Sequence, residues 1–283
     1  MALFFCYFDA SFMDTVAILQ NQAKILRQDI IQMIATAASG HPGGSLSAID
    51  IITALYFKVL RHRPLEPEWS DRDRFILSKG HAAPALYAAL ARTGYFPVEQ
   101  LATFRKLGSP LQGHPEKGKL AGAEASTGSL GQGISIGAGI ALASRLDQKD
   151  YRAYVLMGDG ESNEGQIWEA ALFAAQYKID HLTVILDRNR QQLDGWTKDI
   201  LDTDSLAEKW RAFQWHVIEI DGHNMEAILS AFHDAQTVSG KPTIIIAHTT
   251  KGKGVSFMEN NLEFHGMAPN AEQTQLALQE LSA

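Results

Sequence analysis

The fold of this chain is constrained most by residues 158–195, which read GDGESNEGQIWEAALFAAQYKIDHLTVILDRNRQQLDG. An apolar run, AYVLM, precedes Asp159, and a second apolar run, LTVIL, precedes Asn189. This order predicts a strand, a helix and a second strand. Such a unit is right-handed and parallel, so both strands end at the same edge of the sheet. We therefore expect Asp159 and Asn189 to lie side by side.

The residues at these two strand ends predict a site for a metal and a diphosphate. A carboxylate and an amide oxygen are hard ligands of the kind that Mg²⁺ or Ca²⁺ requires. The glycines that flank Asp159 let a diphosphate approach the backbone closely. The helix that begins near Glu164 directs its amide end toward the same point.

Composition excludes several other classes of protein. A chain of 283 residues with 46% hydrophobic content is long enough for a large core. The net charge of −7 favours neither nucleic acid nor an anionic membrane as a partner. The single cysteine, Cys6, excludes an internal disulfide framework and a zinc site made only of cysteines. No apolar run approaches the roughly 20 residues that cross a bilayer.

The N-terminus departs from the pattern of the rest of the chain. Residues 1–13 are apolar but lack the basic start of a secretory signal. We interpret them as a disordered extension, place one domain over residues 14–283, and expect a cytoplasmic protein. A helical rhythm over residues 15–39 ends at the breaker cluster SGHPGG, and Ser45 is predicted to cap the next helix.

Further along the chain, short apolar runs alternate with helical patterns. This alternation predicts an α/β fold, a doubly wound parallel sheet with helices on both faces. The helix at 168–177 is apolar nearly all round, which predicts that it is buried, against another subunit. The expected strands are 74–78, 153–157, 182–186, 215–220 and 242–247.

Histidines beside glycines mark four separate loops. His41, His81, His114 and His265 stand in SGHPGG, SKGHAAPALY, GHPE and FHG. Imidazole titrates near neutral pH, so a cluster of such rings can move protons or bind phosphate. We interpret the remaining histidines as ordinary ones: His62, His181, His216, His223, His233 and His248.

Together these motifs resemble the amino-terminal, diphosphate-binding half of a transketolase, from about residue 14 to 270. The order and spacing of the motifs match, including STGSLGQG at 126–133 and HTTKGKGVSFMEN at 248–260. Ser129 stands where single-chain transketolases usually have proline. This serine, and the short stretch between KGKG and FHG, resemble the split form that is encoded by two genes.

The resemblance implies a role for individual residues. Asp159, Asn189 and the carbonyl of Gln191 resemble the metal ligands. His41 and His265 resemble the pair that handles the substrate hydroxyl proton, and His114 resembles the histidine that reaches the cofactor-bound substrate. The implied cofactor-binding residues are His81, Gly128, Leu130, Asp159, Gly160, Glu164, Asn189, Gln191 and Leu193, among which Glu164 resembles a carboxylate at a subunit interface.

The resemblance also implies partners. The expected cofactors are thiamine diphosphate and Mg²⁺, with Ca²⁺ or Mn²⁺ as other possible ions. A separate C-terminal subunit, with a pyrimidine-binding domain, would supply the glutamate that activates the cofactor. A second copy of this chain would complete a heterotetramer. The expected reaction moves a two-carbon ketol unit from a ketose phosphate to an aldose phosphate.

Two alternative functions stay open at this point. One is a subunit of another thiamine-diphosphate enzyme, either related to the 2-oxo acid dehydrogenases or a transketolase specialised for another sugar. The four histidines favour ketol transfer over the dehydrogenases. The other is a non-catalytic binding module with the same fold, which the intact Asp159, Asn189 and histidines argue against.

Overall fold

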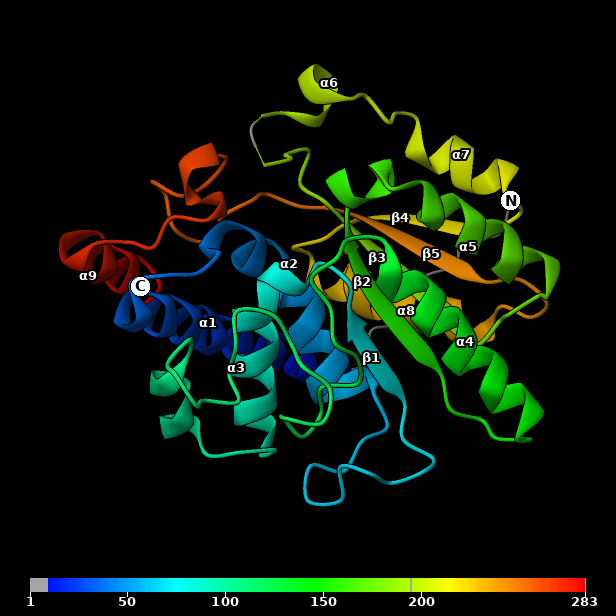
Figure 1. Cartoon of the computed structure of the whole chain (residues 1–283), viewed down its shortest axis with the longest axis horizontal. Helices are drawn as coiled ribbons and strands as arrows, with labels where there is room; N and C mark the ends of the chain where they lie inside the picture. The colour runs from blue at the N-terminus through cyan, green and yellow to red at the C-terminus, as the bar shows by residue number, and fades with distance from the viewer. Residues whose placement is uncertain (1–9, 194, 283) are drawn as a thin grey trace.

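The computed structural model describes residues 10–193 and 195–282, and its centre is one sheet of five strands (Figure 1). The strand order is β1-β2-β3-β5-β4, and every neighbouring pair is parallel. The strands are β1 (Arg74–Leu77), β2 (Ala153–Gly158), β3 (Leu182–Arg188), β4 (His216–Asp221) and β5 (Thr243–His248). All five expected strands are present, within two residues of the predicted bounds.

Helices pack on both faces of the sheet, as the doubly wound fold requires. The helices of one face are α1 (Ala10–Ala37), α2 (Pro42–Ala54), α3 (Ala83–Thr93) and α8 (Met225–Thr237), and those of the other are α4 (Gln132–Leu146), α5 (Gly165–Gln176) and α7 (Leu206–Ala212). The remaining helices are α6 (Thr197–Ile200) and α9 (Ala271–Glu280), with short turns η1 (Leu55–Val59), η2 (Gly80–Ala82), η3 (Val98–Thr103), η4 (Gly160–Asn163) and η5 (Leu262–His265).

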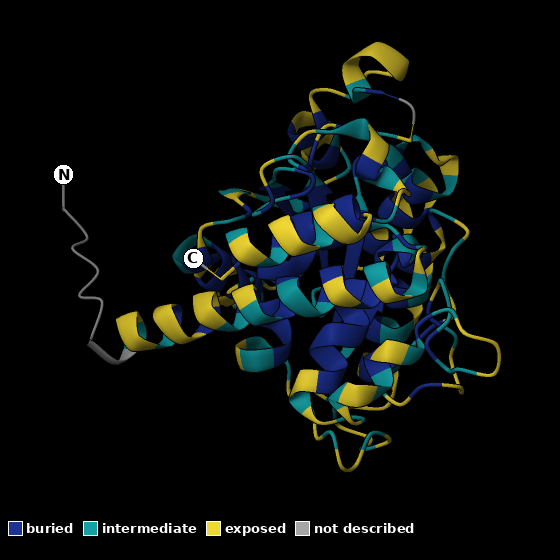
Figure 2. Cartoon of the chain, turned by 90° about the vertical axis from the view of Figure 1, so that its left-hand side faces the viewer, coloured by how far each residue is buried: buried dark blue, intermediate teal, exposed yellow. Residues whose placement is uncertain are grey.

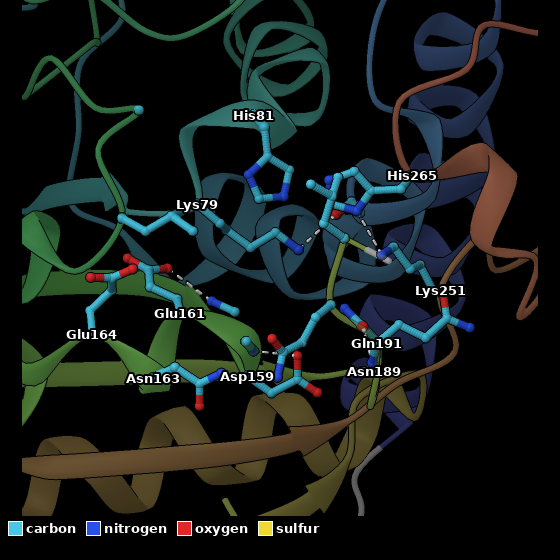
Figure 3. A pocket seen from close by; sticks show the side chains of 17 residues that line it. Lys79, His81, Asp159, Glu161, Asn163, Glu164, Asn189, Gln191, Lys251 and His265 are labelled. Carbon is cyan, nitrogen blue, oxygen red and sulfur yellow. Dashed lines mark hydrogen bonds between the residues drawn. The ribbon is translucent and has the colours of Figure 1, made fainter. Parts of the chain in front are cut away.

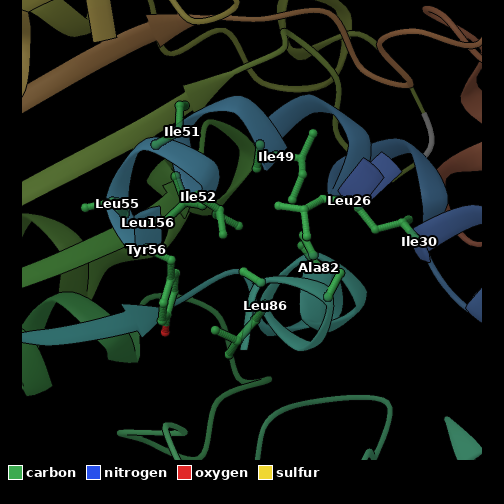
Figure 4. Packing of buried hydrophobic residues seen from close by; sticks show 14 of the residues in the cluster. Leu26, Ile30, Ile49, Ile51, Ile52, Leu55, Tyr56, Ala82, Leu86 and Leu156 are labelled. Atoms are coloured by element: carbon green, nitrogen blue, oxygen red, sulfur yellow. The ribbon is translucent and has the colours of Figure 1, made fainter. Parts of the chain in front are cut away.

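Two hydrophobic clusters lie on the two faces of the sheet, because side chains of a strand alternate between its faces. In β2, Tyr154 and Leu156 belong to the cluster under α1, α2, α3 and α8, whereas Val155 and Met157 belong to the cluster under α4, α5 and α7. Figure 4 shows Leu156 beside Ile52 of α2, in the cluster that also contains side chains of α1 and α3. Full burial of each large apolar side chain contributes about 1.5–3 kcal/mol.

The first two helices begin earlier than the sequence suggested. Helix α1 starts at Ala10, so residues 10–13 are helical and not part of a disordered extension; residues 1–9 lie outside the described part of the chain. Just after its start, α1 exposes Met13, Asp14, Ala17 and Ile18 on one side and buries Val16 and Leu19 on the other, and Figure 2 shows this alternation along the helix. Helix α2 starts at Pro42, and the predicted capping role of Ser45 is wrong. Proline is preorganised for the first helical position, and the Ser45 hydroxyl donates to the His41 carbonyl from within the helix.

Helix α5 is partly buried within the chain, and its outer side is exposed. Ile167, Ala170, Ala171 and Ala174 face the core. Leu172 and Tyr177 on the outer side are 60% and 53% exposed. Among the described helices, none has the combination of length and apolar character needed to cross a membrane.

Two glycines of α4 provide a test of the packing between this helix and the sheet. A Cβ on Gly137 would stand 2.4 Å from Cγ2 of Val155 in β2, whereas a Cβ on Gly139 would meet nothing within 4 Å. We predict that Gly137→Ala destabilises the fold by about 1–3 kcal/mol through overpacking. Gly139→Ala should stabilise it by about 0.5–1 kcal/mol, because alanine favours helix. Urea unfolding of both variants measures this, and equal stabilisation by both would contradict the packing described.

Candidate functional site

A cavity of about 370 Å³ opens at the carboxyl ends of the strands (Figure 3). Lys79 follows β1, Asp159 follows β2, Asn189 follows β3 and Lys251 follows β5, and all four line the cavity. The carboxyl edge of an open parallel sheet is where ligands bind in such folds. The cavity therefore gathers residues that lie far apart in the sequence.

Asp159 and Asn189 lie at neighbouring strand ends, as expected. The Asp159 carboxylate accepts hydrogen bonds from the main-chain N–H groups of Gly160, at 2.8 Å, and of Arg190. The second bond ties the end of β2 to the loop after β3. Burial, and after it the charge of Asp187, raises the pKa of Asp159 to about 7. A bound divalent cation would favour the ionised carboxylate.

The donor groups beside Asp159 fit a divalent cation. The Asn189 side-chain oxygen accepts from the N–H of Gln191 at 3.1 Å and keeps a second lone pair. The buried side-chain amide of Gln191 has no hydrogen-bond partner among the described residues. Three or more histidine, cysteine or acidic side chains do not gather into a metal site anywhere in the described chain. The expected ligand set is different, because it contains one carboxylate, one amide and one main-chain carbonyl.

A buried ion pair between Lys79 and Asp187 lies beside the expected metal ligand Asn189. Lys79 and Asp187 are 2% and 0% exposed, and the Lys79 ammonium donates to the Asp187 carboxylate at 2.5 Å and to the Gly44 carbonyl at 2.9 Å. Burial would raise the pKa of Asp187, but the Lys79 charge and hydrogen bonds outweigh it and hold this pKa below its usual value. Asp187 also accepts from the amide of Asn189 at 3.2 Å. This bond fixes the side-chain amide of Asn189, which lines the cavity.

Glu161 joins three loops around the cavity. Its buried carboxylate accepts hydrogen bonds from the Ser78 hydroxyl and from the main-chain N–H groups of Gly131, at 2.8 Å, and Gly158, at 3.1 Å. These partners follow β1, precede α4 and end β2. Glu164, by contrast, is exposed at the start of α5, although it also lines the cavity.

Three of the four glycine-flanked histidines form a triangle. The ring centroids of His41, His81 and His265 lie 5.4–5.5 Å apart. Burial and the positive charges of neighbouring side chains lower the pKa of His41 to about 4 and that of His265 to about 3. The same causes hold the pKa of His81 well below its usual value. At neutral pH all three rings are uncharged.

The fourth histidine, His114, contacts the loop that holds the expected ring-binding residues. A Cβ on Gly128 would stand 3.2 Å from Cδ2 of His114, so glycine is needed for this approach. Gly128 also has a φ of 150°. Gly128, Leu130, Gly160 and Leu193 line the cavity. His114 itself is exposed and lies outside that lining.

The sequence reasoning missed four buried charged residues of the site: Lys79, Glu161, Asp187 and Lys251. Lys79 stands in SKGH, Glu161 in GDGES and Lys251 in TTKGKG. Asp187 directly follows the apolar run LTVIL. Lys79 and Asp187 directly follow the expected strands 74–78 and 182–186, and this position was the available signal for these two residues. The Lys251 ammonium lies 2.8 Å from Nδ1 of His265, so the TTKGKG segment contacts the FHG segment.

His223, which the sequence analysis interprets as an ordinary histidine, binds the loop that carries Lys251. His223 Nε2 accepts from the main-chain N–H of Thr250 at 2.8 Å, so its Nδ1 carries the proton and donates to Asp50, also at 2.8 Å. Asp50 is paired in turn with the buried Arg27. The network connects α1 and α2 to the loop after β5.

Comparison with known proteins assigns this arrangement to a family. The family described as "Transketolase, thiamine diphosphate binding domain" matches residues 18–282. The chain belongs to the transketolase family. This confirms the family expected from the motifs and, with the sheet described above, the expected fold class.

Relatives of similar length are named as subunits of transketolases. The chain is 47% identical to the 6-deoxy-6-sulfo-D-fructose transketolase subunit of Clostridium sp. (strain MSTE9), with 93% of this chain and 96% of the relative covered. It is 43% identical to an apulose-4-phosphate transketolase subunit from Phocaeicola vulgatus, with 94% and 95% covered. The expected enzyme class, a transferase that acts within a heteromer, agrees with these names.

Longer transketolases share the fold over this region. The crystal structure of transketolase from Campylobacter jejuni has a TM-score of 0.89 and 36% identity, and the match covers 94% of this chain and 43% of that one. Mouse transketolase is 40% identical, with 42% of its length covered. The chain therefore spans about two fifths of the length of these longer transketolases.

Glu161 and Glu164 provide a matched test of how the site is held together. Removing Glu161 leaves the three buried donors without an acceptor, so we predict that Glu161→Ala lowers the free energy of unfolding by about 2–5 kcal/mol. Glu164 is exposed, and Glu164→Ala should change stability by no more than about 0.5 kcal/mol. Urea denaturation of the two variants compares them directly. Equal stability of both would show that the Glu161 carboxylate does not join the loops.

Proposed function

We propose that this chain is the diphosphate-binding subunit of a two-chain transketolase. The proposal rests on one observation in a chain of the transketolase family. Asp159, Asn189 and the histidine triangle lie together at the carboxyl edge of the sheet. Nearly full-length similarity to proteins named as transketolase subunits supports it. The reaction transfers a two-carbon ketol unit between sugar phosphates, and we place it in the cytoplasm.

The residues of the cavity fit thiamine diphosphate and a divalent cation. Asp159, Asn189 and the carbonyl of Gln191 would hold Mg²⁺, and Ca²⁺ or Mn²⁺ would accept the same oxygen ligands. Gly160 and His81 would lie beside the diphosphate end, Gly128, Leu130 and Leu193 beside the rings, and Glu164 at the interface with another subunit. When bound, thiamine diphosphate supplies the carbanion chemistry of ketol transfer.

The chain's own residues hold the charges and protons of the reaction. Lys79 and Lys251 make the cavity favourable for phosphate oxygens, because both ammonium groups are buried at its wall. His41 and His265 would bind the hydroxyl or carbonyl oxygen of the sugar, and His114 would approach from the loop opposite. Neutral rings are suited to donating hydrogen bonds to an oxygen on which negative charge develops.

A separate polypeptide would complete the active site. We propose that it contains the pyrimidine-binding domain and the glutamate that activates the cofactor. The matches to longer transketolases cover only about two fifths of those chains. The region beyond that match in the longer proteins is what a second polypeptide would supply.

A second copy of this chain would cover the outer side of α5. Leu172, Phe173 and Tyr177 are exposed there, and Leu146 on neighbouring α4 is 75% exposed. Exposed apolar groups that gather on two adjacent helices are typical of subunit interfaces. Two copies and two partner subunits would form a heterotetramer with two-fold symmetry.

A specialised sugar substrate is the second candidate, favoured by a specific observation. The two relatives of similar length described above are named for 6-deoxy-6-sulfo-D-fructose and apulose 4-phosphate. The same reaction on an unusual ketose would use the same cavity, because the groups at the reacting end of the sugar do not change.

Cofactor binding should depend on the metal through Asp159. We predict that Asp159→Ala lowers the affinity for thiamine diphosphate by at least about 100-fold, or about 2.7 kcal/mol. The exposed Asp234 in α8 provides a control, because Asp234→Ala removes the same charge far from the cavity. Calorimetric titration of the assembled enzyme with and without EDTA measures this effect. Unchanged affinity in Asp159→Ala would remove the assignment.

Activity should require the second polypeptide. We predict no ketol transfer by the purified chain with thiamine diphosphate, Mg²⁺ and a ketose–aldose phosphate pair, and transfer once a candidate pyrimidine-domain partner has been added. A coupled assay of the aldose product measures both conditions, and light scattering measures the assembly. Transfer by the chain alone would contradict the two-chain proposal, and a stable monomer would contradict the pairing through α5.

A further inference from the structure

Arg105 contacts the ring of His41 at its Nδ1 atom. Its Nη1 donates to the Ser39 hydroxyl at 2.6 Å, and its Nη2 lies 3.4 Å from Nδ1 of His41. A guanidinium group has hydrogen-bond donors but no acceptor. The Nδ1 atom of His41 must therefore accept this bond and carry no proton. The single proton of the uncharged ring is then on Nε2.

The protonated nitrogen of His41 lies close to Gly266, the residue after His265. Its Nε2 lies 3.6 Å from the point where a Cβ on Gly266 would stand, beside His265. The ring also lies 5.4 Å from that of His81. The Nε2 side of His41 therefore lies beside the segment that carries His265 and Gly266.

The position of Arg105 is set by the backbone around it. Its N–H donates to the carbonyl of Leu111 at 2.8 Å, and its φ of 59° is left-handed. A Cβ on Gly113 would stand 3.0 Å from both Nε and Nη2 of Arg105, so the glycine before His114 allows this close approach. The guanidinium is held between the loops of His41 and His114.

The charged and titratable groups around His41 favour its uncharged form. Arg105, His114, Lys251, His81 and His265 face the ring from five separate segments. Burial is the largest cause of its lowered pKa, and the Arg105 charge is the next. Burial and Arg105, in the same order, also lower the pKa of His114.

We infer that Arg105 is a positioning residue that fixes His41 as the Nε2-protonated tautomer and so makes it a hydrogen-bond donor toward the substrate oxygen. The part of this inference that concerns the substrate rests on the proposed function. His265 shows the same arrangement, because the Lys251 ammonium lies 2.8 Å from its Nδ1. A pair of Nε2–H groups would then stabilise negative charge on one oxygen.

Nuclear magnetic resonance of the full chain tests the tautomer without any reaction. In a chain labelled with ¹⁵N-histidine, two-bond correlation spectra distinguish a protonated from an unprotonated ring nitrogen, and His41→Gln identifies the His41 signals. We predict that His41 carries its proton on Nε2 and titrates near its lowered pKa of about 4. A proton on Nδ1 of His41 in the unmodified chain would overturn the inference, whatever the variants do.

Three variants then isolate the role of Arg105. Arg105→Met removes the charge and the donor, so His41 should populate both tautomers and its pKa should rise from about 4 toward 6.5. Arg105→Lys keeps a charged donor and should restore the single tautomer. Arg92→Met is the control, because Arg92 pairs with Asp29 at the surface. The signals of His81 and His265 report whether each variant is folded. An unchanged tautomer and pKa in folded Arg105→Met would contradict the inference.

The assembled enzyme provides a second readout. Arg105→Met should lower kcat by up to about 100-fold, because a misdirected donor no longer meets the substrate oxygen, while the affinity for thiamine diphosphate stays the same. A raised pKa protonates His41 at a higher pH, so the acid limb of the kcat profile should move upward in pH. An identical profile for Arg105→Met and the unmodified enzyme would contradict the catalytic part. Absence of ketol transfer with any partner would instead contradict the proposed function and leave the tautomer result intact.

Discussion

The buried ion pair between Lys79 and Asp187 is the interaction on which the rest of the site depends. Taking two charges out of water costs several kcal/mol for each ion, so such a pair persists only when its remaining hydrogen bonds are satisfied. Here Ser47, Thr249 and Asn189 bond Asp187, and the Gly44 carbonyl accepts from Lys79. The pair therefore joins α2 to the ends of β1, β3 and β5. Through Asp187 it also holds the side-chain amide nitrogen of Asn189.

Burial and neighbouring cations hold the histidines of the site in one protonation state. His41, His81 and His265 stay uncharged because they are desolvated and face Arg105, Lys79 or Lys251. Uncharged imidazoles beside buried ammonium groups form a surface that donates hydrogen bonds and attracts anions. Such a surface suits a diphosphate and a sugar oxygen, and it needs no rearrangement of charge within the chain.

The sheet and its carboxyl edge could be predicted because they depend on short-range patterns. Alternating apolar runs define the strands, and the parallel order brings Asp159 and Asn189 to one edge. The partners of Glu161, Lys79 and Arg105 could not be predicted in this way. Each is decided by how loops far apart in the sequence fold over the strand ends, as when Glu161 binds the N–H groups of Gly131 and Gly158. Likewise, the start of α2 depended on Pro42, whose fixed backbone angle outweighed the capping preference of Ser45.

We propose that metal and diphosphate bind together at the ends of β2 and β3. Mn²⁺ tests it most directly, because this ion broadens the resonances of nearby nuclei. Mn²⁺ and thiamine diphosphate are added to the ¹⁵N-labelled chain. We expect the cofactor's ³¹P signals to broaden, together with the amide signals of Gly160, Arg190 and Gln191. Amides at the opposite edge of the sheet, such as those of Ala153 and Leu182, should stay sharp. Broadening centred elsewhere, or of the ³¹P signals without the amides of these strand ends, would contradict it.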